Sequence, residues 1–256
     1  MDNKDFINNY PIILVHGFLG WGREEMAGYK YWGGEDDIQA ELNDSHYRTY
    51  TATVGPFSSN WERAVELYHY ITGGTVDYGA AHSEKHNIKR YGHTYQGIYS
   101  EVSDENKVHL VGHSMGGLTI RQLENFLKEG SAEEREYYKK HPETGISDLF
   151  LGGKNWIHSC TSICTPHNSS TVLIQEDLIA RVLYPALLEI AALAGFNHLN
   201  FLYDFKLEQW GLKKEKGEYF LEYLDRILDS SIWKSKNTAW FDMSLEGSKK
   251  INKMTV

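Results

Sequence analysis

The sequence of 256 residues predicts an α/β fold with a mainly parallel sheet, because short apolar runs typical of buried strands alternate with segments of helical periodicity. Hydrophobic residues make up 41% of the chain, which is enough to build a sizeable core. The formal net charge of -9 argues against a nucleic-acid partner, since phosphate binding requires a basic face.

Four segments are predicted to be strands and two to be helices. The first strand is a short, apolar and β-branched run, as expected of a strand buried inside a parallel sheet, and the second alternates Tyr and Thr. The strands are predicted at 11–15, 47–54, 107–111 and 156–164, and the helices at 61–73 and 118–128. This order indicates crossover connections between parallel strands.

We interpret residues 1–256 as a single domain that carries an insertion. Residues 74–95 run into a loop rich in histidine and look like an inserted subdomain rather than a simple crossover. We place this subdomain within residues 45–95.

The two cysteines, Cys160 and Cys164, lie in the fourth predicted strand. Four residues along a strand span about 13 Å, which is beyond the reach of a disulfide. We therefore expect two buried free thiols. Residues 1–9 lack the apolar run of a signal peptide, and no stretch approaches the roughly 20 apolar residues of a membrane span.

The motif with the clearest chemistry is Gly-His-Ser-Met-Gly-Gly at residues 112–117, between the third predicted strand and a helix. A Gly-x-Ser-x-Gly string alone is a weak signal, but a tight strand-to-helix turn is the setting of the nucleophile elbow of α/β-hydrolases. Ser114 is therefore the predicted nucleophile for acyl transfer. The glycines on both sides would let neighbouring backbone approach the strained serine.

A second element supports this interpretation. His16, Gly17 and Phe18 follow the first strand, where the α/β-hydrolase fold places a donor of its oxyanion hole. We predict that the backbone N–H groups of Phe18 and Met115 face the charge of the tetrahedral intermediate. His16 itself is interpreted as structural rather than catalytic.

The chain resembles the zinc-containing bacterial true lipases of the staphylococcal and thermophilic-bacillus type. The matching stretches are 11–22, 55–61, 73–82 and 203–211, and the resemblance covers essentially the whole chain. It implies an α/β-hydrolase that is secreted, that acts on lipid or short acyl esters, and that uses a helical lid at the lipid–water interface.

The resemblance also implies a structural zinc ion. Its ligands would correspond to Glu62, where the family usually has Asp, to His82 and to Asp242. Ile88 stands where the family has its second histidine, so His86 would have to supply the fourth ligand by a loop shift. The alternative is that His82 and His86 are polar loop residues without a metal.

The family orders its catalytic residues as Ser, Asp and His, and no residue after Ser114 matches the motif of the last two. We therefore expect the catalytic Asp and His, the last strands of the sheet and any calcium site to lie outside this chain. Three histidines could act as a substitute base: His158, His167 and His198. His167 is the least implausible of these, since it follows the fourth strand.

Residues 171–205 have apolar side chains at helical spacing. They would be either an ordinary core helix or a lid, and beside an acyl site we favour a lid within residues 171–230. The sequence thus predicts a serine-dependent ester hydrolase, a triacylglycerol lipase or carboxylesterase, that is truncated before its catalytic Asp and His. The alternative is a catalytically dead lipase fragment or a binding module.

Overall fold

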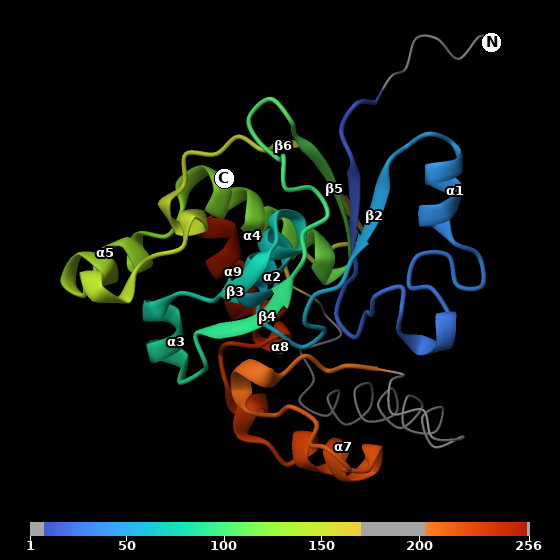
Figure 1. The fold of residues 1–256 in the computed structure, drawn as a ribbon. Coiled ribbons are helices and arrows are strands. Elements are labelled where there is room, and N and C mark those ends of the chain that lie inside the picture. Colours follow the sequence, from blue (N-terminus) through green and yellow to red (C-terminus); the bar gives the residue numbers. More distant parts are fainter. Residues whose placement is uncertain (1–7, 170–202, 255–256) are drawn as a thin grey trace.

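The computed structural model describes residues 8–169 and 203–254 (Figure 1). Its main sheet has four strands in the order β2-β1-β5-β6, and all three neighbouring pairs are parallel. The strands are β1 (Ile12–Val15), β2 (Thr49–Ala52), β5 (Val108–His113) and β6 (Ile157–Ile163). Helices pack against this sheet, so the prediction of an α/β-hydrolase fold with a mainly parallel sheet is confirmed.

The register of the two central strands decides where the functional loops meet. β1 and β5 pair in parallel, with Ile12 opposite His109 and Val15 opposite Gly112. Both strands therefore end at the same edge of the sheet. The loop that starts at His16 and the turn at Ser114 leave the sheet side by side, although about a hundred residues separate them in the chain.

Two helices form the layer next to the central strands. α4 (Met115–Glu129) packs on β1, β5 and β6, and α2 (Asn60–Thr72) packs against α4. Leu118, Leu123 and Phe126 of α4 are buried in or beside this core. The other α-helices are α1 (Ile38–Asp44), α3 (Ala80–His86), α5 (Ala132–Lys140), α7 (Phe220–Leu228), α8 (Ala239–Asp242) and α9 (Leu245–Met254). The 3-10 helices are Met26–Gly28, Pro142–Thr144, Asp148–Leu151, Glu208–Trp210 and Ser231–Lys234.

Residues 74–95 form a small unit of their own. β3 (Gly74–Asp77) and β4 (Tyr91–Tyr95) pair antiparallel in a second sheet, with α3 between them. The carboxylate of Glu134 accepts the backbone N–H groups of Ala81 and His82, which attaches α3 to α5. The predicted boundaries of the insertion, 45–95, also include β2, which pairs in the main sheet.

The prediction of two buried free thiols is right about the bonding and wrong about the burial. Cys160 and Cys164 are both free, but both are exposed. The reason is that β6 is the last strand of the four-stranded sheet, and most of its residues are exposed. An apolar strand pattern predicts burial only where other elements cover both faces.

Most of the amphipathic segment 171–205 lies outside the described residues, so its interpretation as a lid stays a prediction. None of the described helices combines the length and the apolar character needed to cross a bilayer.

Candidate active site

Ser114 lies at the junction of β5 and α4 with backbone angles of φ 52° and ψ -126°. A positive φ is strained for a residue with a side chain, and it is the backbone signature of a nucleophile elbow. The glycines around it are required by space. A Cβ atom on Gly112 would lie 2.4 Å from the carbonyl carbon of Gly116, and one on Gly116 would lie 2.2 Å from the carbonyl oxygen of Val15.

The loop after β1 approaches the serine closely. A Cβ atom on Gly17 would lie 2.9 Å from the Cβ atom of Ser114, so only glycine fits there without a shift of its neighbours. Phe18 follows on this loop, and Met115 is the first residue of α4. Neither the Phe18 N–H nor the Met115 N–H donates a hydrogen bond to a described residue. Both amides are thus available to a substrate oxygen.

Tyr31 holds the two halves of this site together, and sequence reasoning missed it. Its hydroxyl accepts the backbone N–H of Gly17 at 3.0 Å and is hydrogen-bonded to Nδ1 of His113 at 2.6 Å. The tyrosine therefore bridges the Phe18 loop and the elbow, and burial raises its pKa. No local pattern could have identified it, because 82 residues separate Tyr31 from His113.

Arg63 supports the same loops from beneath. This fully buried guanidinium donates to the carbonyl oxygens of His16 and Gly55 and to the hydroxyl of Thr119. Burial lowers the pKa of Arg63 to about 10, so it stays charged at neutral pH. His16 is buried as well and donates from Nδ1 to the Gly17 carbonyl while Nε2 accepts the N–H of Val54. Both ring nitrogens of His16 are thus used in structural bonds.

The structure also shows how the candidate bases are placed. His158 packs against Tyr10 and His109 at 5.1 and 4.8 Å between ring centroids, and makes no contact with Ser114 that would suit a base. His167 bonds through Nδ1 to Arg121 and through Nε2 to the hydroxyl of Ser162. His198 lies outside the described residues. Within residues 8–169 and 203–254, no histidine is hydrogen-bonded to the Ser114 side chain.

The predicted metal ligands lie near one another beside α3. Nε2 of His82 is 3.7 Å from Oε1 of Glu62, and the His82 and His86 rings lie 4.6 Å apart between centroids. Asp242 accepts the backbone N–H of Asn60 at 2.6 Å. His82, His86 and Asp242 line one pocket of about 110 Å³. Burial lowers the pKa of His82 to about 3, so its ring is neutral, as a metal ligand must be.

These side chains fit a zinc site only in part. Nε2 of His82 is buried and has no hydrogen-bond partner, which a metal ion would satisfy. However, the Glu62 carboxylate already accepts the side-chain amides of Gln209 and Asn237. No group of three or more His, Cys, Asp or Glu side chains within the described ranges is placed to hold a metal ion. The four predicted ligands would have to move closer together to bind zinc.

Comparison with known proteins connects this geometry to a family. A protein-family model described as lipase-like, C-terminal domain, matches residues 8–256. Lipase 1 of Staphylococcus aureus (strain MRSA252) is 45% identical over 255 residues, which cover 97% of this chain and 36% of that relative. The lipase of Staphylococcus epidermidis is 43% identical over 259 residues, with 98% and 37% covered. The chain thus spans about a third of the length of these relatives.

Solved structures agree with the sequence comparison. EstA from Clostridium botulinum is 52% identical with a TM-score of 0.88, over 97% of this chain and 57% of that one. Lipase 1 from Pelosinus fermentans is 47% identical with a TM-score of 0.87, over 97% and 65%. Staphylococcus hyicus lipase is 40% identical with a TM-score of 0.80. Since the family model matches nearly the full length of the chain, the chain belongs to the lipase-like, C-terminal domain family.

Proposed function

We propose that the protein hydrolyses carboxylic esters of lipid or short acyl type, with Ser114 as the nucleophile. The observation that carries the proposal is the strained backbone of Ser114 at the β5–α4 junction, next to two amides without partners among the described residues. Relatives named lipase support this class of substrate.

The proposed chemistry is acyl transfer in two steps. The Ser114 Oγ attacks the ester carbonyl carbon while a base takes its proton, and the Phe18 and Met115 N–H groups bind the oxyanion that forms. The tetrahedral intermediate collapses and expels the alcohol, which takes up the proton from the base. Water then attacks the acyl-enzyme by the same route and releases the carboxylic acid and the free serine.

We propose that the base lies outside the described residues, since both nitrogens of His167 are engaged and His158 packs elsewhere. If that base is the family's catalytic histidine rather than His198, extending residues 1–256 through a segment that carries the family's Asp and His should raise ester turnover well over tenfold. A chain of residues 1–256 that reaches within tenfold of the extended one would require a base inside it. A catalytically dead lipase fragment or a binding module remains the second candidate function.

The test of the nucleophile is labelling of the full-length protein with an organophosphonate ester, read by intact mass and peptide mapping. We expect one adduct, on Ser114, and none in Ser114→Ala. Ser162→Ala is the matched control, because the Ser162 hydroxyl is hydrogen-bonded to a histidine, His167, near this edge of the sheet and its loss should not affect labelling. Labelling at Ser162, or more than about a hundredth of the activity remaining in Ser114→Ala, would refute the role of Ser114.

Three finer points belong to the same proposal. A zinc ion would be held by Glu62, His82 and Asp242 with His86, and the buried Nε2 of His82 supports it. Secretion and action at a lipid–water interface through a lid follow from the family resemblance. Metal analysis, the cell fraction that contains the protein, and the dependence of activity on emulsified substrate would test them in turn.

A further inference from the structure

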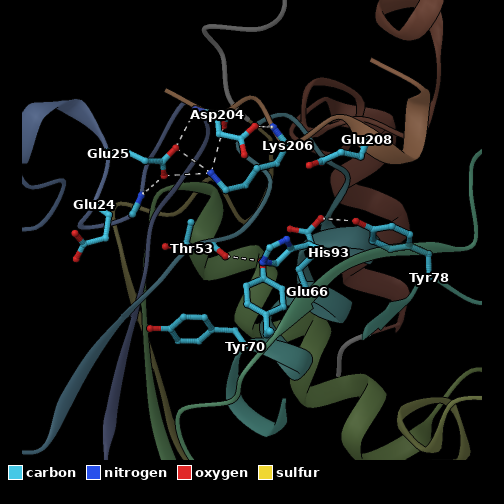
Figure 2. A pocket seen from close by; sticks show the side chains of 12 residues that line it. Glu24, Glu25, Thr53, Glu66, Tyr70, Tyr78, His93, Asp204, Lys206 and Glu208 are labelled. Atoms are coloured by element: carbon cyan, nitrogen blue, oxygen red, sulfur yellow. Dashed lines mark hydrogen bonds and ion pairs between the residues drawn. The ribbon is translucent and has the colours of Figure 1, made fainter. Parts of the chain in front are cut away.

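A pocket of about 370 Å³ lies where several segments of the chain meet, away from the serine (Figure 2). It is lined by Gly22, Glu24 and Glu25 of the loop after β1, by Thr53, by Glu66 and Tyr70 of α2, by Tyr78, by His93 and Tyr95 of β4, and by Asp204, Lys206 and Glu208. None of Ser114, Phe18 and Met115 lines it. Its volume falls within the range of sites for small molecules, about 300–1,000 Å³.

The pocket has aromatic walls that are held in place from behind. The tyrosine hydroxyls are bound to other groups of the protein, so their ring surfaces are what remains for a ligand. The bonds are Tyr70 to the Thr51 carbonyl, Tyr78 to the Glu66 carboxylate and Tyr95 to the Thr53 carbonyl, each at 2.8 Å. Tyr95 also meets Tyr70 and His93 edge to face, at 5.9 and 4.9 Å between centroids. Such walls are fixed before a ligand arrives.

The lining is strongly acidic. Five carboxyl side chains line the pocket against a single lysine, Lys206, whose ammonium is bonded to Glu25 at 3.0 and 3.1 Å. The side-chain carboxylates of Glu24 and Glu208 make no hydrogen bond or ion pair with any residue in the described part of the chain. The Asp204 carboxylate accepts only the backbone N–H of Lys206 there. Figure 2 shows Asp204 and Tyr70 on opposite sides of the pocket.

The pKa of a tyrosine in the pocket wall is consistent with the acidic lining. Tyr95 has a pKa well above its ordinary value, first because it is buried and then because Glu66 and Glu208 lie near it. Acidic side chains thus lie close to an aromatic ring of the pocket.

We infer that this pocket binds a small organic cation that carries an alkylammonium group. An ammonium over tyrosine rings is attracted by their π faces, and nearby carboxylates without partners add Coulomb attraction. The methyl or methylene groups of such a cation suit the apolar ring surfaces. A bare metal ion does not fit as well, since the lining of this pocket places no group of three His, Cys, Asp or Glu side chains to hold one, and Lys206 is already bonded to part of the acidic lining.

The ligand test uses choline as the probe and its neutral carbon analogue, 3,3-dimethylbutan-1-ol, as the matched control. Isothermal titration of the full-length protein should give saturable one-site binding of choline, at least twofold tighter than binding of the alcohol, because a cation–π attraction of about 0.5–2 kcal/mol corresponds to roughly two- to thirtyfold in affinity. Equal affinities for the two, or no saturable binding of choline in any form, would overturn the inference.

Variants assign the binding to this pocket. Glu208→Gln and Tyr70→Leu should each weaken choline binding at least threefold, while Tyr70→Phe keeps the ring and should retain the affinity. Glu105→Gln removes a carboxylate from an exposed loop that does not line the pocket and serves as the control. Thermal melts establish that each variant is folded. Unchanged affinity in both Glu208→Gln and Tyr70→Leu would refute the assignment.

A third arm distinguishes a free cation from a lipid headgroup. Saturable binding of free choline supports a soluble ligand, and binding only to phosphatidylcholine vesicles, lost in Glu208→Gln, supports the same ammonium site acting on a headgroup. The inference does not depend on the hydrolase proposal. Ser114→Ala should bind choline as the unmodified protein does, so the failure of one proposal can be told from that of the other.

Discussion

Replacing Tyr31 by phenylalanine tests whether the two halves of the candidate active site depend on one hydroxyl group. The substitution keeps the ring and removes only the oxygen that joins the Gly17 N–H to Nδ1 of His113. The Gly17 N–H is buried and would be left without an acceptor, which costs about 1–3 kcal/mol of folding free energy. We expect the free energy of unfolding to fall by that amount.

The effect on activity follows from position. Gly17 directly precedes Phe18, so a loop released from Tyr31 shifts one of the two proposed oxyanion donors. A displacement on the order of 1 Å in a catalytic group can cost about a hundredfold in rate. For the full-length protein with a short-chain nitrophenyl ester, we expect kcat to fall roughly ten- to a hundredfold, with KM changed much less, because the lost contact acts on the transition state.

Tyr29→Phe is the matched control. It removes a hydroxyl from the same loop, but Tyr29 is 53% exposed and its hydroxyl makes no hydrogen bond with a described residue. The stability and kcat of this variant should therefore not change. Urea unfolding and steady-state kinetics measure both variants. If Tyr31→Phe keeps kcat within twofold and unfolds at the same urea concentration as the parent, then the Tyr31 hydroxyl neither stabilises the fold nor positions the Phe18 loop.

Three further outcomes are expected. Arg63→Lys should lower the free energy of unfolding by about 2–4 kcal/mol in urea titrations, because a lysine ammonium cannot make the three hydrogen bonds of the guanidinium to His16, Gly55 and Thr119. An unchanged urea midpoint would contradict this. Burial raises the pKa of Glu66 to about 7, so the folded state keeps a proton that the unfolded state loses near pH 4.5. The contribution of Glu66 to stability should therefore be greatest below that pH and be lost as pH rises through 7, by on the order of 3 kcal/mol, and Glu66→Gln should remove this part of the pH dependence. Chelator-treated protein reloaded with zinc should hold about one ion per chain and lose it in His82→Ala, whereas a ratio near zero would show that Ile88 has abolished the site.

Local sequence patterns were sufficient to predict the segments that form the candidate active site. The strand–turn–helix around Ser114, the glycines beside it and the loop at Phe18 are contiguous in the chain, and their backbone conformation follows from nearby residues. The same holds for the order of strands and helices. The resemblance to bacterial lipases added the expected substrate class and the zinc hypothesis. The spacing of Glu62 and the other predicted zinc ligands would not by itself have suggested a metal site.

Burial was predicted less well than strand formation. The run that contains Cys160 is a strand, as its β-branched residues indicate, and Cys164 directly follows it, but both thiols are exposed. Whether a strand is covered depends on what lies on either side of it in the sheet, and a strand's own sequence contains only part of that information.

The sequence by itself determined the α/β fold and the position of the elbow, because both depend on hydrophobic periodicity and on glycine at fixed offsets. Only the tertiary structure decided that Tyr31 joins the Phe18 loop to the elbow, that Arg63 is buried under both, and that carboxylates from three segments surround the tyrosines of the 370 Å³ pocket. These contacts join residues tens to more than a hundred positions apart. Their partners are chosen by the packing of the whole chain, which no local pattern encodes.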